Sequence, residues 1–261
     1  GCYMTSERDE FFYHEAITHP AALAHPNPTS ALVIGGGDGG STEELLKHPS
    51  MRRVVLAELD AEVIRVAREH LQNVHRGAFD DPRVELRIGD GWESAEALAS
   101  EAETLAHGAR RFDLVVLDLT DPDTPAHRLY TADFFRLLRR LMNPGAAVTL
   151  HIGSPLYRPD LVARLLRELA SVFAIVRPLG LYIPLYGAYW GLCCASDALD
   201  PLSLDPETAE RRLAERGIGD LRYYNGDTHQ GLFALPNFYR ELLPGETGVK
   251  SATVVELARA S

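Results

Sequence analysis

A chain of 261 residues, 46% of them hydrophobic, is long enough for one large α/β domain. Its 37 acidic residues outnumber its 26 basic ones, and the net charge of -11 argues against a nucleic-acid-binding protein, which usually presents a basic face. This charge suits a cationic ligand, although a solvated acidic surface is the commoner reason for such a charge.

The lack of a recognisable targeting signal and the small number of cysteines predict a cytoplasmic protein. No apolar run approaches the roughly 18 residues of a membrane span, and no signal peptide is recognisable, so we expect no membrane partner. Cys2, Cys193 and Cys194 lack the spacing of metal ligands, and so few cysteines fit a reducing compartment. Cys193 and Cys194 lie within an apolar run, which predicts core thiols.

In chain order, an amphipathic helix near 8–17 and a proline-containing connection precede alternating strands and helices. Five apolar runs ending in acids or glycines predict parallel strands buried on both faces of a doubly wound sheet. The expected strands are 31–37, 52–60, 83–91, 112–121 and 146–153. The expected helices are 41–47, 61–72, 93–106, 131–142 and 158–171.

The last part of the chain has a different pattern. Residues 173–196 predict a strand followed by an antiparallel pair, and 205–217 predict a short helix. The aromatic segment after about residue 220 predicts a loop. No linker divides the chain, so we expect one catalytic domain over 1–261, with 1–30 as its N-terminal helix and connection.

The stretch ALVIGGGDGGSTEELL (31–46) matches the dinucleotide-binding pattern G-x-G-x-x-G, but with an aspartate inside the loop. Such a match alone is a weak signal. Asp38, Glu43 and Glu44 add negative charge where a pyrophosphate needs a positive helix end, which disfavours an NAD-linked dehydrogenase. Ser41 and Glu44 also match the S-x-x-E capping box, which predicts that the helix begins at Ser41.

Acids or a histidine follow all five predicted strands. Ligands of open α/β sheets bind beyond the carboxyl ends of the strands, so these residues are the candidate site. Any single one is as often a helix cap or a turn residue, but a cluster of carboxylates is unfavourable unless cations compensate it. The candidates are Asp38, Glu58, Asp60, Asp90, Asp118, Asp121 and His151.

The positions of these acids fit an S-adenosyl ligand. Glu58 would bind the ribose hydroxyls, and Asp90 would accept a hydrogen bond from the adenine amine. Asp38 would repel the amino-acid carboxylate of S-adenosylmethionine and pair with the aminopropyl ammonium of its decarboxylated form. The residues therefore favour the decarboxylated ligand, and an S-adenosylmethionine-dependent methyltransferase is the alternative.

Several motifs, ERDEFFYHE (7–15), GGGDGG (35–40), FDLVVLDLTDP (112–122) and YIPLYGAYWGL (182–192), resemble those of the polyamine aminopropyltransferases, typified by spermidine synthase. The resemblance extends over roughly 7–243. It implies an α/β, Rossmann-like doubly wound sheet of the S-adenosylmethionine-dependent methyltransferase type. It also implies transfer of an aminopropyl group from decarboxylated S-adenosylmethionine to an amine, putrescine first of all, with release of 5'-methylthioadenosine. Decarboxylated S-adenosylmethionine is then a co-substrate, with no permanently bound cofactor or metal.

The resemblance also implies roles, position by position. Asp121 is the catalytic base and Asp118 its acidic neighbour, on the acceptor side. Asp38 binds the aminopropyl ammonium, Glu58 the ribose and Asp90 the adenine. The remaining residues that it places around the ligands are Gly36 and Gly91 at the nucleoside, and Tyr13, His14, His151 and Tyr186 at the amine acceptor.

Three departures from the family pattern concern the acceptor. The usual N-terminal β-stranded domain, which contributes an acceptor contact and part of the oligomer interface, is missing ahead of the first motif. In the loop at 121–130, Thr124 replaces a glycine, and His127 and Arg128 add charge beside the expected acceptor channel. His151 replaces a glutamine. A homo-oligomer is still expected from the family, and a non-catalytic nucleoside- or polyamine-binding relative is the further alternative.

Overall fold

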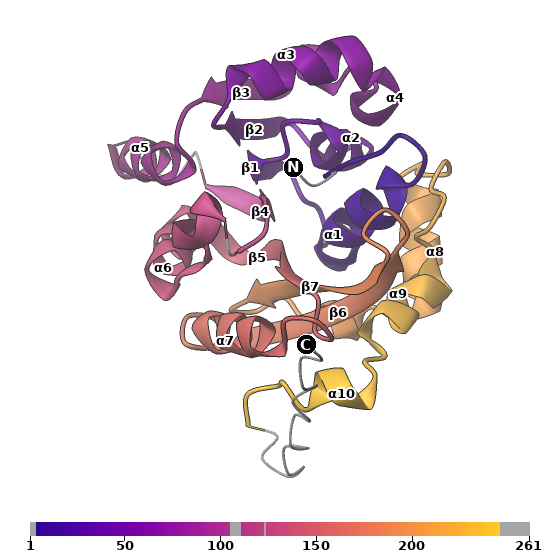
Figure 1. The fold of residues 1–261 in the computed structure, drawn as a ribbon. Helices are drawn as coiled ribbons and strands as arrows, with labels where there is room; N and C mark the ends of the chain where they lie inside the picture. The colour runs from indigo at the N-terminus through magenta and orange to yellow at the C-terminus, as the bar shows by residue number, and fades with distance from the viewer. Residues whose placement is uncertain (1–3, 105–110, 123, 246–261) are drawn as a thin grey trace, which may run out of the picture.

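The computed structural model describes residues 4–104, 111–122 and 124–245, which fold around one seven-stranded sheet (Figure 1). The strands lie in the order β3-β2-β1-β4-β5-β7-β6, with β1 to β5 parallel and β7 antiparallel to both of its neighbours. They are β1 (Ser30–Gly35), β2 (Arg53–Glu58), β3 (Val84–Ile88), β4 (Phe112–Asp118), β5 (Met142–Gly153), β6 (Ile175–Ile183) and β7 (Ala188–Ser196).

Helices cover both faces of this sheet, as a doubly wound fold requires. The α-helices are α1 (Glu10–Ala24), α2 (Gly40–Leu46), α3 (Ala61–His70), α4 (Gln72–His75), α5 (Gly91–Thr104), α6 (Ala132–Leu141), α7 (Pro159–Ala170), α8 (Pro206–Glu215), α9 (Gly226–Phe233) and α10 (Asn237–Arg240). Short 3-10 turns are η1 (Ala78–Asp80), η2 (Pro125–Tyr130) and η3 (Pro201–Ser203). None of the described helices combines the length and apolar character needed to cross a membrane.

Successive residues of β1 point to opposite faces of the sheet and belong to two different hydrophobic cores. Leu32 and Ile34 belong to the core under α5, α6 and α7, whereas Ala31 and Val33 belong to the core under α1, α2, α3, α8 and α9 (Figure 1). Strand residues on successive positions face opposite sides of a sheet, so a strand apolar at every position is buried on both faces. The doubly wound fold expected from the sequence is therefore confirmed.

Three expected elements differ from those observed. β3 is an edge strand with partly exposed residues, because it has a neighbour on one side only, and it is not buried on both faces as expected. The segment 173–196 forms only the β6–β7 hairpin, without a preceding strand. The segment after residue 220 is not a loop, because α9 and α10 form there. The expected end of the helix at 105–106 lies outside the described residues.

The N-terminal helix is longer and more deeply buried than its sequence indicated. It continues to Ala24 through Pro20, and it is buried on nearly all sides, so it is not amphipathic. Residues from the far end of the chain enclose it: the carboxylate of Glu15 accepts hydrogen bonds of 2.8 Å from the backbone N–H groups of Arg222, Tyr223 and Tyr224. This contact fixes the helix that carries Tyr13 and His14.

Candidate active site

A cavity of about 840 Å³ opens at the carboxyl ends of β1, β2 and β4, where the strand order reverses around β1. This is where doubly wound sheets bind their ligands. Ten of the residues predicted for the site line it: Tyr13, His14, Gly36, Asp38, Glu58, Asp60, Asp90, Gly91, Asp118 and Tyr186.

The glycine loop brings backbone close to the acids of this cavity. Gly36 has φ +67°, a left-handed conformation that favours glycine, and its N–H donates to the carbonyl of Asp118 at 2.7 Å. A Cβ atom at Gly36 would lie 2.9 Å from Oδ2 of Asp118, and one at Gly37 would lie 2.8 Å from Oε2 of Glu58. Glycine is therefore needed here both for the turn and for the close approach.

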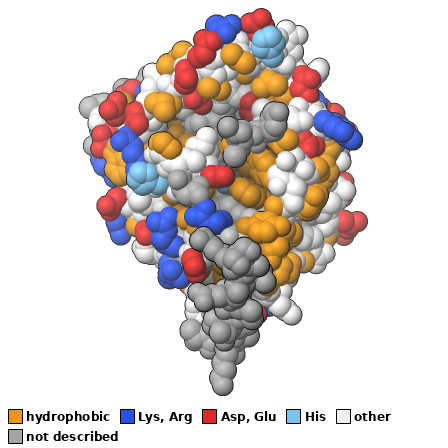
Figure 2. Space-filling model, viewed as in Figure 1, with side chains coloured by type: hydrophobic (Ala, Val, Ile, Leu, Met, Phe, Trp, Pro, Cys, Tyr) orange, Lys and Arg blue, Asp and Glu red, His pale blue; other side chains and the backbone are white. Residues whose placement is uncertain are grey.

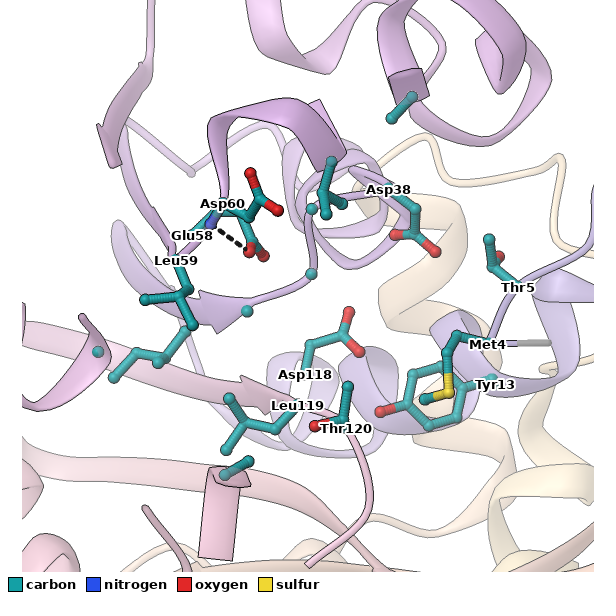
Figure 3. Close-up of a pocket in the computed structure, with 18 of the residues that line it drawn as sticks. Met4, Thr5, Tyr13, Asp38, Glu58, Leu59, Asp60, Asp118, Leu119 and Thr120 are labelled. Atoms are coloured by element: carbon teal, nitrogen blue, oxygen red, sulfur yellow. Dashed lines mark hydrogen bonds between the residues drawn. The ribbon is translucent and has the colours of Figure 1, made fainter. Parts of the chain in front are cut away.

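Asp38, which Figure 3 shows at one end of the cavity, pairs with the buried side chain of His14. Oδ1 of Asp38 accepts from the N–H of Gly40 at 3.0 Å, and Oδ2 lies 3.4 Å from Nε2 of His14. Nδ1 of His14 lies 2.7 Å from Oε2 of Glu10, one helical turn earlier. Burial opposes ionisation of Asp38, but the charge of His14 outweighs it and lowers the pKa of Asp38 to about 2.

Asp118 ends β4 beside this pair. Its Oδ2 accepts from the hydroxyl of Ser41 at 2.7 Å, and burial and the charge of Asp38 raise its pKa. The hydroxyl of Tyr13 points toward Asp118 (Figure 3) and has no hydrogen-bond partner in the described part of the chain. Burial and the Asp118 charge raise the pKa of Tyr13 well above its usual value, which favours the protonated phenol.

Three acids lie at the other end of the cavity. Oε1 of Glu58 accepts from the N–H of Asp60 at 3.0 Å (Figure 3), and burial raises the pKa of Glu58. Asp60 and Asp90 each cap a helix: Asp60 accepts from the N–H of Glu62 at 2.8 Å, and Asp90 accepts from that of Trp92 at 2.8 Å. The cap interpretation therefore holds for both, although both also face the cavity.

Two acids of the glycine loop do not act as expected. The carboxylates of Glu43 and Glu44 point away from the cavity and pair with Lys47, at 3.3 Å and 2.9 Å. The expected capping box is wrong, because the helix begins at Gly40 and the Ser41 hydroxyl binds Asp118 instead. Of the three acids in this segment, only Asp38 faces the ligand space.

Asp121 and His151 do not line this cavity. His151 lies within β5, not at its carboxyl end, and is only 3% exposed, with Nε2 2.8 Å from the carbonyl of Leu119 and 2.9 Å from the hydroxyl of Tyr130. Burial lowers its pKa. Burial is the main cause of the raised pKa values of Tyr130 and Tyr186, and the charge of Asp121 also contributes. Asp121 therefore lies near these two aromatic rings.

The two basic residues expected beside the acceptor channel lie elsewhere. The guanidinium of Arg128 pairs with Oδ1 of Asp90, at the opposite end of the cavity from Tyr13 and His14. His127 is exposed, with Nδ1 3.2 Å from the carbonyl of Thr124.

Sequence reasoning missed Ser41 and Glu10. Ser41 was assigned to a helix cap, and its partner Asp118 is 77 residues away, so no local pattern could reveal the contact. Glu10 had a local signal, because it precedes His14 by four residues and such residues share one face of a helix.

The lining of the cavity is strongly acidic. The described lining residues include eight carboxylates against one arginine, Arg128, and one histidine, His14. Acidic side chains are also spread over the visible face of the molecule rather than gathered in one patch (Figure 2). The excess negative charge of the chain is therefore partly solvated surface and partly a potential that attracts a cationic ligand.

Comparison with known proteins agrees with this arrangement. Residues 10–201 match the spermine/spermidine synthase domain. A polyamine aminopropyltransferase of Nitrosomonas europaea is 51% identical over 243 residues, covering 93% of this chain and 72% of the relative. Polyamine aminopropyltransferase 2 of Hyperthermus butylicus is 39% identical over 245 residues, covering 93% and 77%.

Two solved structures share the fold. A spermidine synthase in complex with the transition state analogue AdoDATO superposes with a TM-score of 0.82 at 33% identity, over 93% of this chain and 78% of that one. The spermidine synthase of Thermotoga maritima gives 0.80 at 34%, over 93% and 77%. The fold and the site thus define a transferase with a methyltransferase-like Rossmann architecture. The chain belongs to the spermine/spermidine synthase family and is a polyamine aminopropyltransferase.

Proposed function

We propose that the chain transfers the aminopropyl group of decarboxylated S-adenosylmethionine to putrescine, giving spermidine and 5'-methylthioadenosine. The observation that carries the donor is the pair of half-buried carboxylates, Asp38 and Asp118, at the end of the cavity away from Asp90. A ligand whose charges are all positive is attracted there, whereas the carboxylate of S-adenosylmethionine is repelled.

Glu58 and Asp90 support the nucleoside end of this proposal. Glu58 ends β2 at the cavity and is positioned for the ribose hydroxyls, while Gly91 allows close packing, because a Cβ atom there would lie 2.6 Å from Ile34. Asp90, whose Oδ1 already accepts from backbone N–H groups, is positioned to accept from the adenine amine through its other oxygen. Gly36 lets the backbone approach the sulfur side of the ligand.

The acceptor side is formed by Tyr13, Tyr186 and the neighbouring acids. The ring centroids of Tyr13 and Tyr186 are 6.5 Å apart, and Tyr186 packs on Trp190 at 4.9 Å. An alkyl diamine presents a methylene chain to such rings and an ammonium to nearby carboxylates. In this proposal His151 does not contact the acceptor but packs behind Tyr186, since its ring stacks on Trp190 at 6.1 Å.

The reaction is a displacement at carbon. The neutral amine attacks the methylene next to the sulfonium, the carbon–sulfur bond breaks, and its electrons neutralise the sulfur as methylthioadenosine leaves. Alkyl amines have pKa values of about 10, so the attacking amine must first lose a proton. In this proposal Asp121 accepts that proton. The rest of the rate enhancement comes from positioning the two cationic substrates, the donor and the amine acceptor, against Asp38 and Asp118.

One assay tests this proposal against its alternatives. The protein is incubated with decarboxylated S-adenosylmethionine and, separately, with each of a panel of diamines and polyamines, and the products are identified by mass spectrometry. We expect methylthioadenosine and an elongated amine, with putrescine as the best acceptor. Methyl transfer from S-adenosylmethionine would indicate a methyltransferase, and nucleoside binding without methylthioadenosine for any acceptor would indicate a non-catalytic binder.

A further inference from the structure

His14 sits between two carboxylates at the end of the cavity that we assign to the aminopropyl group. Nδ1 lies 2.7 Å from Glu10 and Nε2 lies 3.4 Å from Asp38, and the side chain is almost completely buried. Ionised carboxylates only accept hydrogen bonds, so a ring whose two nitrogens both face carboxylates must carry a proton on each. The geometry thus describes an imidazolium.

The same two carboxylates that would hold a ligand ammonium face this imidazolium. A ring nitrogen of His14 and one carboxylate oxygen each of Asp38 and Asp118 all lie within 4.8 Å of one another. An ammonium in contact with both Asp38 and Asp118 is therefore also within a few ångströms of Nε2 of His14. Two positive charges at that separation in a buried site repel each other strongly.

His14 has little room to move away from an arriving cation. A Cβ atom at Gly40 would lie 2.2 Å from its ring, so the ring lies directly against the start of α2. The other titratable groups around the ring are Tyr13 and Glu10 on α1, Asp38 on the glycine loop and Asp118 on β4. Glu43 and Glu44 on α2 point the other way, toward Lys47.

We propose that His14 is a donor-discriminating residue, which releases its ring proton when a ligand ammonium occupies the subsite between Asp38 and Asp118. This inference rests on the proposed function, because it takes that subsite as the place of the aminopropyl group. With His14 neutral, the subsite complements an ammonium alone. With His14 charged, the Asp38–His14 pair complements an ammonium beside a carboxylate, as in S-adenosylmethionine. Discrimination against the carboxylated ligand therefore increases with pH.

The direction of the effect follows from proton linkage. Burial opposes the charge on His14, but the carboxylate of Asp38 and its neighbours raise the pKa of His14 well above its usual value. Because both ring nitrogens face carboxylates, the ring is charged in the free protein, and in this proposal it becomes neutral when the donor binds. Between the pKa of His14 with the donor bound and its pKa in the free protein, the dissociation constant of decarboxylated S-adenosylmethionine falls by about tenfold for each unit that the pH rises.

Isothermal titration calorimetry tests the proposal. Decarboxylated S-adenosylmethionine is titrated into the whole protein at a series of pH values, in buffers of low and high ionisation enthalpy, which counts the protons released. The matched ligand is 5'-methylthioadenosine, which has the same nucleoside and no ammonium. We expect about one proton released for the decarboxylated donor and none for methylthioadenosine. Equal proton release for the two ligands would overturn the inference.

Two variants separate His14 from its neighbours. His14→Gln keeps an amide that donates to Asp38 but does not titrate, so proton release and the pH dependence of donor discrimination should both disappear. Glu10→Gln removes one flanking carboxylate, so proton release should move to lower pH. Undiminished release in His14→Gln overturns the role of His14 and leaves the proposed donor intact. Failure of the decarboxylated donor to bind at any pH, while methylthioadenosine binds, contradicts the proposed donor itself.

Discussion

The hydroxyl of Ser41 donates a hydrogen bond of 2.7 Å to Oδ2 of Asp118 and joins the first turn of α2 to the end of β4. Ser41→Ala removes only this donor from a fully buried position. We expect aminopropyl transfer to fall roughly tenfold, because a hydrogen bond to a charged group contributes about 1.5–3 kcal/mol and here orients the carboxylate. Release of methylthioadenosine at saturating donor measures it, and an unchanged kcat would show that Asp118 needs no such support.

Asp121→Asn tests the proposed base. We expect the rate of transfer to fall by about 10²–10⁴, since a positioned base contributes that much, while methylthioadenosine binds nearly as in the unaltered protein. Asp118→Asn is the comparison: because its carboxylate lies beside Asp38, it should weaken binding of the decarboxylated donor more than that of methylthioadenosine. Close to full turnover in Asp121→Asn would remove Asp121 from the mechanism.

Asp90 is predicted to accept a hydrogen bond from the adenine amine. Asp90→Ala should weaken binding of methylthioadenosine by about tenfold or more, because it removes an acceptor whose partner is then left unpaired. The matched ligand is 5'-methylthioinosine, which lacks that amine and should bind the unaltered protein weakly. If the variant loses as much affinity for the inosine ligand as for the adenosine ligand, Asp90 does not recognise the amine.

Gly40 lies against the ring of His14, and a Cβ atom there would come within 2.2 Å of it. Gly40→Ala should displace the ring, lower stability by about 1–3 kcal/mol and weaken binding of the decarboxylated donor. Gly231→Ala is the control, since an exposed helical glycine with open space around it gains up to about 1 kcal/mol from alanine. Denaturant unfolding and donor titration measure both effects. Equal stability of the two variants would contradict the contact.

Glu15 ties α1 to the C-terminal part of the chain. Glu15→Gln replaces an acceptor-only carboxylate by an amide that also carries donors, so some of the backbone N–H groups of residues 222–224 lose their partner. We expect a loss of about 2–3 kcal/mol, and hence a Tm lower by roughly 4–12 °C. The exposed Glu207→Gln should leave the Tm within about 2 °C. A small change in Glu15→Gln would mean that α1 is held mainly by apolar packing.

Periodicity and strand-end acids predicted the sheet and most of the site. Apolar runs buried on both faces are typical of parallel strands, and parallel strands bring their carboxyl ends to one edge. Asp38, Glu58, Asp90 and Asp118 could therefore be assigned to one site from their positions along the chain, and all four line the cavity. The C-terminal helices could not be predicted in this way, because their burial depends on distant elements: α9 packs on α8 and β6, and Tyr239 of α10 enters the core under α5, α6 and α7.

Side-chain direction is what the sequence did not indicate correctly. A helix start shifted by one residue, from Ser41 to Gly40, turned an expected cap into a donor for Asp118. The same helix directs Glu43 and Glu44 to Lys47 rather than to the ligand, because their positions on the helix face away from the cavity. His151 was expected at a strand end, but β5 continues past it to Gly153.

The sequence by itself determined the fold, the acidic character of the site and the family, because these depend on residue types repeated along the chain. Only the tertiary structure decided which acids face the cavity and which cations oppose them. Those pairings, such as Glu10 and Asp38 with His14, depend on the direction of each side chain in a packed core. His14, expected at the amine acceptor, thereby proved to be the partner of Glu10 and Asp38.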